Sequence, residues 1–110
     1  MKPETYHSKK NPFIAAMFDV STCHITKKDN NLLIENKDPS TNPELIVYGY
    51  PEGYFIFVPD QVEDLQDKLK AEGYSKELIN LLILAHQHDC IFLRLDADGV
   101  SYEDLPTFDW

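Results

Sequence analysis

A predicted hairpin in the middle of the chain constrains the fold more than any other feature. Residues 45–50 and 54–58 are two short apolar runs rich in β-branched and aromatic residues, and Pro51-Glu52-Gly53 joins them. Such a Pro-x-Gly connection is typical of an antiparallel hairpin, in which we expect Gly53 to supply a positive φ. Pro59 ends the second strand because proline has no backbone N–H to donate to a sheet. The chain therefore contains a sheet that includes these two strands.

Two further strands are predicted, one toward each end of the chain. In residues 13–22, Phe18, Val20 and Thr22 fall on one face of an extended strand. Residues 90–95 are a nearly continuous apolar run, which favours a strand that is buried on both sides or lies in the middle of a sheet. We therefore expect a sheet of about four strands.

The first predicted helix follows Thr26. Thr26 is a good N-cap residue, and Asp29 stands three residues further on, where a capping partner or a first-turn anion belongs. Leu32 and Leu33 would then face the sheet. After this helix, residues 38–43 contain two prolines and are predicted to form a loop.

Two more helices are predicted between the hairpin and the last strand. Asp60, with Glu63 at the third helical position, favours a helix start, and Gly73 suits the residue that follows a helix end. Ser75 begins the next helix, which runs to about His88 and is apolar almost all round. That pattern is typical of a helix at the centre of a core.

These elements predict an α+β protein with the order β-α-β-β-α-α-β. One mixed sheet of about four strands, with helices packed on it, would form a single two-layer domain. Residues 1–12 are polar and are expected to be a flexible leader, while residues 13–110 form the globular domain. A chain of 110 residues has the commonest single-domain size, so we expect no second domain.

Negative charge is concentrated in the second part of the chain. Residues 1–37 hold six lysines against four acids, a net charge of +2, and residues 38–110 hold four bases against fifteen acids, a net charge of −11. Such a surface repels nucleic acid and anionic lipid and attracts basic proteins. We therefore expect a basic protein partner, and neither direct nucleic-acid binding nor membrane binding. The alternative interpretation is that the acidity serves only solubility.

Several patterns indicate a cytoplasmic protein without a cofactor. The polar N-terminus lacks the apolar segment of a secretory signal, and the densest apolar run, residues 78–85, is far shorter than the ~20 residues of a membrane span. Cys23 and Cys90 are far apart and lack metal-site spacing, so we expect reduced thiols. With only four glycines and no phosphate-binding glycine loop, no cofactor is expected.

The candidates for catalytic residues are His24, Asp96 and Asp98. On a continued strand, His24 would share a face with apolar residues, which favours a histidine at the rim of the core over a general base. A catalytic His24 would need Asp96, Asp98 or Asp109 as its partner. The Asp96-x-Asp98-Gly99 sequence could hold a divalent cation, but it lacks EF-hand spacing, and Asp and Gly also favour turns. We therefore expect no metal site.

A candidate partner-binding surface combines the aromatic hairpin with the acids that follow it. In a two-layer fold one face of the hairpin would stay exposed, and aromatic residues there suit a protein interface. The alternative is that these aromatic residues fill the core and its rim. The predicted partner-binding residues are Tyr50, Glu52, Tyr54, Asp60, Glu63, Asp64 and Asp67.

Four segments carry distinctive motifs: residues 19–26 with Ser-Thr-x-His-x-Thr, the aromatic hairpin 48–59, residues 88–99 ending in Asp-x-Asp-Gly, and residues 105–110 with Pro-x-x-Asp-Trp. Together they resemble a family of short bacterial proteins that is catalogued as a domain of unknown function and is met on plasmids and other mobile elements. The resemblance covers about residues 17–110 and implies a shared fold and a bacterial or mobile-element origin, but no activity. It singles out His24, Asp96, Asp98, Asp109 and Trp110.

Three functions follow as hypotheses. The first is a non-enzymatic interaction protein that inhibits or modulates a basic, nucleic-acid-handling partner, since spaced carboxylates imitate the charge of phosphates. The second is a small hydrolase or metal-dependent enzyme that uses His24 with Asp96 or Asp98. The third is a structural domain that self-associates through the edge of the hairpin.

Overall fold

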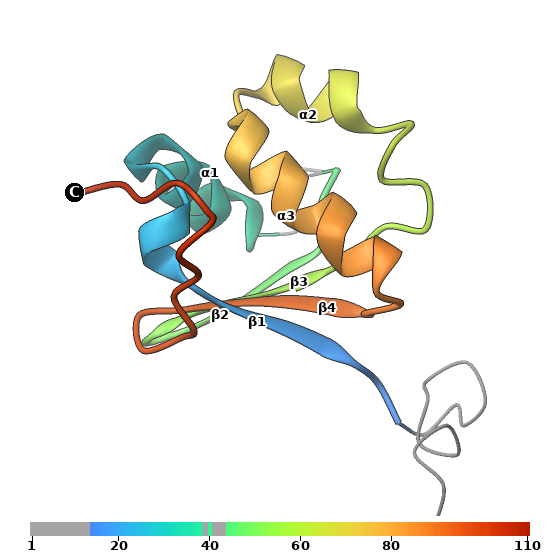
Figure 1. Cartoon of the computed structure of the whole chain (residues 1–110). Helices are drawn as coiled ribbons and strands as arrows, with labels where there is room; N and C mark the ends of the chain where they lie inside the picture. Colours follow the sequence, from blue (N-terminus) through green and yellow to red (C-terminus); the bar gives the residue numbers. More distant parts are fainter. Residues whose placement is uncertain (1–13, 39, 41–43) are drawn as a thin grey trace, which may run out of the picture.

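The computed structural model describes residues 14–38, 40 and 44–110 (Figure 1). Its sheet consists of β1 (Met17–Ser21), β2 (Val47–Tyr50), β3 (Gly53–Phe57) and β4 (Phe92–Asp96). The order across the sheet is β1-β4-β3-β2, with β1 parallel to β4 and the other neighbours antiparallel. The mixed sheet, the hairpin and the inner position of the last strand are as predicted. The predicted leader 1–12 and most of the predicted loop 38–43 lie outside the described residues.

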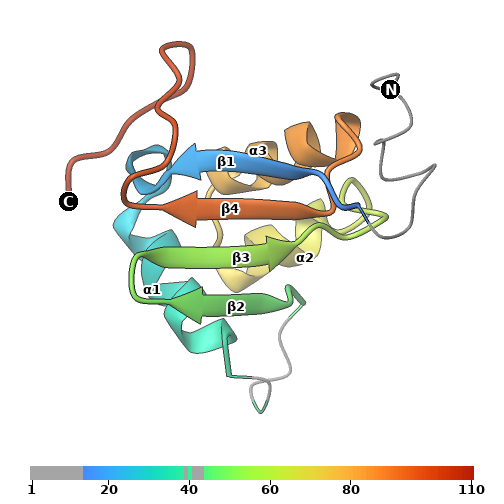
Figure 2. The same cartoon turned by 90° about the horizontal axis from the view of Figure 1, so that it is seen from below.

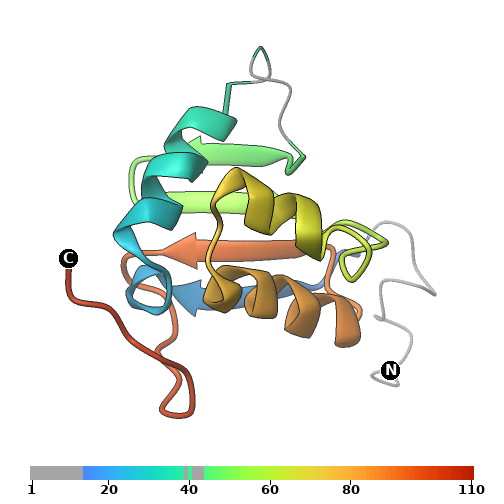
Figure 3. The same cartoon turned by 90° about the horizontal axis from the view of Figure 1, so that it is seen from above.

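The helices all lie on one side of the sheet (Figures 1 and 3). They are the short 3-10 helix η2 (Thr22–His24) and the α-helices α1 (Lys27–Asn36), α2 (Gln66–Glu72) and α3 (Lys76–Gln87). Gly73 ends α2 with a left-handed φ of 107°, as predicted. The predicted α+β class and the predicted order of elements are therefore confirmed, and the elements form one domain.

Asp29 joins the starts of two helices. Its backbone N–H donates to Thr26 Oγ1 (3.0 Å) and its Oδ2 accepts from Thr26 N–H (3.1 Å), which is the capping box that the sequence predicts. Its Oδ1 also accepts from the N–H of Ser75 (2.8 Å), the residue that caps α3. Asp29 is fully buried, so this carboxylate fixes α1 against α3 inside the domain.

The start of α2 differs from the prediction. Residues 61–65 form successive turns held by backbone hydrogen bonds that span three residues, such as Leu65 N–H to Val62 O (3.1 Å). The helix begins only after these turns, so Asp60 does not cap it and Glu63 is not its third residue. The tighter turns bury Val62 completely. Burial of this side chain outweighs the local preference for a helix start.

Gly53 is needed for space and not for a positive φ. It is the first residue of β3, where it pairs with both Tyr50 and Asp96, so the turn consists of Pro51-Glu52 alone. Its φ is not positive, and the prediction of a positive φ is wrong. A Cβ atom at Gly53 would lie 1.8 Å from the backbone oxygen of Leu95. The close approach of β4 therefore requires glycine here.

The first strand is shorter than predicted. It ends at Ser21, whose Oγ accepts a hydrogen bond from Cys23 N–H (3.2 Å), and the chain then turns into η2. His24 therefore lies in a 3-10 helix and does not share a strand face with Phe18 and Val20. The cause is local, because a serine side chain that bonds the backbone two residues on favours a turn over a continued strand.

The core lies between the sheet and the helices. The side of the sheet that faces the helices, called the covered face below, contributes the buried side chains of Val20, Val47, Ile56, Leu93 and Leu95. The helices contribute buried leucines, among them Leu33 of α1, Leu69 of α2 and Leu82 of α3. The opposite face of the sheet carries no helix of the described chain, as Figure 2 shows. It is called the uncovered face below.

Candidate functional site

The uncovered face carries three rows of side chains, because residues that are paired across strands lie side by side and alternate residues share a face. The first row consists of Met17, Phe92, Phe57 and Ile46. The second row consists of Asp19, Arg94, Phe55 and Tyr48, and the third of Ser21, Asp96, Gly53 and Tyr50. The face is therefore apolar at the end where β1 and β4 begin, and mixed toward the other end.

The first row is a strip of large apolar side chains that remains partly in contact with water. Ile46, Met17 and Phe57 are 53%, 42% and 39% exposed, and Phe92 is half-buried between its neighbours. The rings of Phe57 and Phe92 pack edge to face with 5.7 Å between their centroids. Contiguous exposed apolar side chains of this size are typical of a protein interface.

Carboxylates border this strip. A cavity of about 390 Å³ opens next to Phe57 and is lined by Phe57, Val58, Asp60, His86, Asp89, Cys90 and Ile91. Glu63 lies just beyond it, with its Oε1 3.8 Å from Nδ1 of His86. Phe57 is thus the point at which the apolar strip meets acidic residues.

Arg94 organises the centre of the uncovered face. Its Nη2 donates to Asp96 Oδ2 (2.8 Å) and its Nε donates to the Tyr50 hydroxyl (3.0 Å). Its guanidinium lies 5.9 Å from the ring centroid of Phe55, and Nη1 is 3.8 Å from Asp19 Oδ1. The hydroxyl of Tyr50 donates to Asp96 and, with the backbone N–H of Asp98, keeps the pKa of the Asp96 carboxyl below its usual range. Asp96 is consequently an ionised partner of Arg94.

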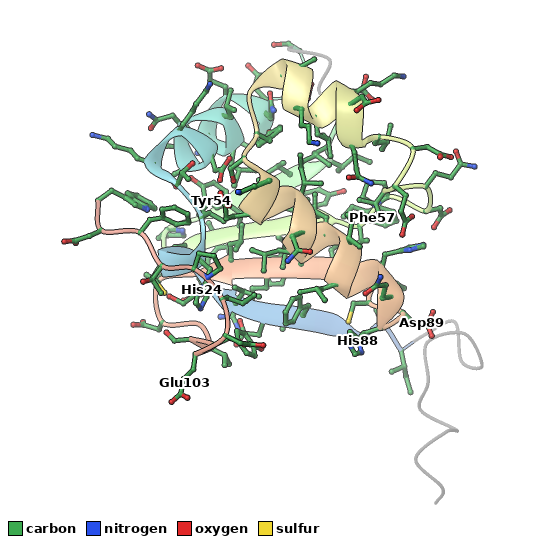
Figure 4. All side chains as sticks on the ribbon, turned by 45° about the horizontal axis from the view of Figure 1, so that its top comes forward. His24, Tyr54, Phe57, His88, Asp89 and Glu103 are labelled. Carbon is green, nitrogen blue, oxygen red and sulfur yellow. The ribbon has the colours of Figure 1, made fainter. Side chains whose placement is uncertain are left out.

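His24 has a structural position. Its ring is buried between η2 and the C-terminal segment, as Figure 4 shows. Nδ1 lies 2.7 Å from the backbone oxygen of Pro106, and Nε2 accepts the backbone N–H of Tyr102 (2.9 Å). A carbonyl can only accept and an amide N–H can only donate, so Nδ1 carries the proton and the ring is neutral. Both nitrogens are therefore occupied, and the predicted alternative role as a general base gains no support.

Asp96 and Asp98 do not complete a site with His24. The carboxylate of Asp96 is on the uncovered face with Arg94, whereas the hydrogen bonds of His24 all go to the backbone of the C-terminal segment. Asp98 is exposed, and its N–H donates to Asp96 Oδ1 (2.7 Å) in a turn. The interpretation of this acidic sequence as a turn is therefore the one that the contacts favour.

The remaining motif residues fasten the C-terminal segment to the corner between β1 and η2. Trp110 Nε1 donates to Ile25 O (2.8 Å), and Phe108 N–H donates to Cys23 O (2.8 Å). A Cβ atom at Gly99 would lie 2.6 Å from Val20 O, so glycine allows the segment to cross β1 closely. Asp109 is exposed. Most of the motif residues therefore hold the fold together.

Six of the seven predicted partner-binding residues form two separate groups, and Tyr54 belongs to neither. Tyr50 is half-buried on the uncovered face and Glu52 is exposed in the hairpin turn. The acids Asp60, Glu63, Asp64 and Asp67 are all exposed, but they follow the other end of β3. The two groups are separated by the five residues of that strand, about 17 Å at 3.3 Å per residue. Tyr54 is the exception, because it is buried in the core and its hydroxyl donates to Asn30 Oδ1 (2.7 Å).

Several residues of the uncovered face were missing from the prediction. They are Met17, Ile46, Phe92 and Arg94. Phe57, at the border of the acidic cavity, belongs to the predicted aromatic hairpin but was not among the predicted partner-binding residues. The signal in the sequence is that β1, β3 and β4 carry large apolar residues at consecutive positions, which indicates two apolar faces. The pairing of distant strands was needed to show that these residues form one strip.

The described residues contain no obvious metal centre. In residues 14–38, 40 and 44–110, no three His, Cys, Asp or Glu side chains are placed to hold a metal ion together. Cys23 and Cys90 are both free thiols. No helix within the same residues is long and apolar enough to cross a membrane.

The comparisons with known proteins identify a family without a known activity. No curated protein and no solved structure matches the chain. A family model described as the C-terminal domain of a family of unknown function, DUF5983, matches residues 17–110. This span begins with β1 and ends with the C-terminal tryptophan, so it includes every helix and strand described above. The chain belongs to this family of unknown function.

Proposed function

We propose that the chain is a non-enzymatic interaction module that binds a basic protein through the first row of the uncovered face and the carboxylates beside it. The observation that carries this proposal is the apolar strip of Met17, Phe92, Phe57 and Ile46, one residue from each strand region, on a face that no helix of the described chain covers. An apolar centre with a charged rim is the usual anatomy of a protein interface.

Charge supports the choice of a basic partner. Asp60 and Asp89 line the cavity beside Phe57, and the chain from residue 38 onward carries a net charge of −11. Complementary charge speeds association and excludes acidic partners. A partner that normally handles nucleic acid presents cations for phosphates, so the carboxylates compete for the same surface. The module would thus act as an inhibitor or modulator of such a protein.

The size of the face supports a role for the acidic rim in binding. Four strands spaced at about 4.8 Å and five residues long at about 3.3 Å each cover roughly 19 Å by 17 Å, or on the order of 320 Å². A stable interface needs about 800 Å² from each partner. The partner must therefore extend beyond the sheet, and the segment that carries Asp60 and Glu63 adjoins the strip.

The test is affinity capture from an extract of the organism that encodes the chain, with the partner identified and quantified over a series of salt concentrations. We expect the wild type to retain a protein of high isoelectric point whose capture falls as salt rises, since screening weakens exposed charge pairs. Phe57→Ala should lower this capture about tenfold, because central aromatic residues dominate binding energy. Asp60→Lys combined with Glu63→Lys should lower it at low salt.

Glu103→Lys combined with Asp104→Lys is the matched control, because it reverses two exposed charges on the C-terminal segment. It should leave capture close to that of the wild type. A partner whose capture persists at high salt and in both test variants would refute the proposal. The proposal would also be refuted if the chain formed a dimer that the Phe57→Ala substitution dissociates, because the uncovered face would then bind a second copy of the chain.

A further inference from the structure

A second cavity lies on the helix side of the domain, away from the uncovered face. It has a volume of about 390 Å³ and is bounded by α3, by α2 and by the C-terminal segment, which lies on the other side of α3 from α2 in Figure 1. Ile79 and Ile83 of α3 and Leu105 of the C-terminal segment give it an apolar lining. This volume lies at the lower end of the range for small-molecule sites, about 300 to 1,000 Å³.

The charge around this cavity is opposite to that of the chain as a whole. From residue 38 onward the chain has only four bases, and two of them, Lys70 and Lys76, line the cavity. Within the described residues neither ammonium group forms an ion pair. Glu77 is the single carboxylate among the lining residues. The cavity therefore offers two unpaired cations above an apolar surface in a protein of net charge −9.

We infer that this cavity binds a small amphipathic carboxylate. The apolar body of the ligand lies on Ile79, Ile83 and Leu105, and its carboxylate lies within reach of Lys70 and Lys76, whose long side chains can bend toward it. An apolar pocket with a few polar groups that fix orientation is the usual design of such a site. An amine or a purely apolar molecule would leave the two cations without a partner.

The ligand would also contact the C-terminal segment that His24 holds. Leu105 and Pro106 form part of the cavity wall, and His24 lines it as well while bonding to the backbone of Pro106. A bound carboxylate therefore links α3 to this segment. Trp110, the only tryptophan, lies in the same segment and bonds to Ile25 O, so its fluorescence reports changes there.

The experiment is a titration of the full chain with octanoate and octylammonium below their micelle concentrations and with octanol below its solubility limit. Binding is measured by isothermal calorimetry and by NMR shifts of the Ile79 and Ile83 methyl groups. We expect octanoate alone to saturate, with shifts at both isoleucines. Lys70→Gln and Lys76→Gln should each weaken octanoate about two- to fivefold, the range expected for exposed ion pairs. Lys68→Gln is the matched control, because it removes an exposed charge from α2 that does not line the cavity. It should leave octanoate binding unchanged.

Asn80→Phe provides a second variant, because Asn80 is exposed and lines the cavity, so a larger side chain there fills the site without entering the core. It should abolish octanoate binding while the thermal melt stays like that of the wild type. Equal binding of octylammonium, or octanoate binding that survives both Lys70→Gln and Asn80→Phe, would overturn the inference. Phe57→Ala should not alter octanoate binding, so this result is independent of the protein partner.

Discussion

Both faces of the sheet carry large apolar side chains, but only those of one face are buried. On the covered face, Ile56 and Leu93 are completely buried under the helices. On the uncovered face, Phe57 and Met17 are about 40% exposed although they are also large and apolar. Both sets alternate along the same strands, and only one set has helices to cover it (Figures 2 and 3). The covered face therefore forms the core of the domain, whereas the uncovered face is free of helices and is the surface for which a binding role is proposed above.

The polar residues on the two sides of the sheet also differ, in the groups to which they bond. On the helix side, Asp29 and His24 are buried and bond to backbone groups that join separate elements. On the uncovered face, the carboxylate of Asp96 is also buried, but it pairs with the partly exposed guanidinium of Arg94, which lies over two aromatic rings. A change that leaves a buried backbone group without a partner is costly, whereas the loss of one of the donors to Asp96 leaves its carboxylate bonded to the others. The following variants test this contrast.

Ile56 and Phe57 give the largest contrast, since they are neighbours on β3 whose side chains enter opposite faces. We expect Ile56→Ala to lower the free energy of unfolding by about 3 kcal/mol, and Phe57→Ala to lower it by about 1 kcal/mol or less. Urea denaturation of the two variants measures the difference. Equal losses would show that the uncovered face is as necessary for folding as the covered face.

His24→Ala should be the next most damaging change. It removes two hydrogen bonds and leaves the Tyr102 N–H and the Pro106 oxygen without partners, at a cost of about 2 to 3 kcal/mol. Hydrogen exchange should show faster exchange of the Tyr102 and Phe108 amides. His88→Ala, at an exposed histidine, is the matched control. Unchanged exchange in His24→Ala would mean that His24 does not hold the C-terminal segment.

Tyr74 makes the helix side sensitive to alkaline pH. Its ring is buried, and burial raises the pKa of its hydroxyl from 10.0 to about 12. The folded state therefore binds this proton more tightly than the unfolded state, so the stabilisation is complete below pH 10 and is lost as the pH rises to about 12. The loss should be on the order of 2 kcal/mol after allowance for solvent screening. Denaturation at pH 9 and at pH 11.5 measures this loss of stability. The Tyr74→Phe variant should lose less stability between the two pH values than the wild type. An equal loss in both proteins would contradict the assignment to Tyr74.

Tyr50→Phe should have the smallest effect. It removes one hydroxyl that bonds Asp96 and Arg94 on the uncovered face, which should cost about 0.5 to 1 kcal/mol. Thermal unfolding at neutral pH is sufficient to measure it. A loss as large as that of His24→Ala would show that the polar network of the uncovered face is a main source of stability.

Local signals predicted those parts of the fold that depend on local interactions. Thr26 and Ser75 cap α1 and α3 as their positions indicate, and the Pro-x-Gly sequence marks the hairpin. Two of the errors lie where distant segments decide the conformation, whereas the early end of β1 has a local cause in Ser21. Gly53 is required by the approach of β4, and the turns after Asp60 are set by the burial of Val62.

The candidate site was only partly predictable for the same reason. The expectation that one face of the hairpin stays exposed identified Tyr50 but also included Tyr54, which faces the core. A single residue of offset exchanges the two faces of a strand. Met17 and Phe92 join the strip through the pairing of β1 with β4, which are separated by most of the chain. That pairing leaves no local mark in the sequence.

The most direct measurement is photo-crosslinking in the cells that encode the chain. A photoreactive phenylalanine analogue replaces Phe57 in one protein and Glu103, which points away from the domain in Figure 4, in a control. We expect the analogue at position 57 to crosslink to a protein of high isoelectric point, with a yield that Asp60→Lys reduces, and the control to give no such product. No crosslink at position 57, or the same product from both positions, would contradict a binding role for the uncovered face.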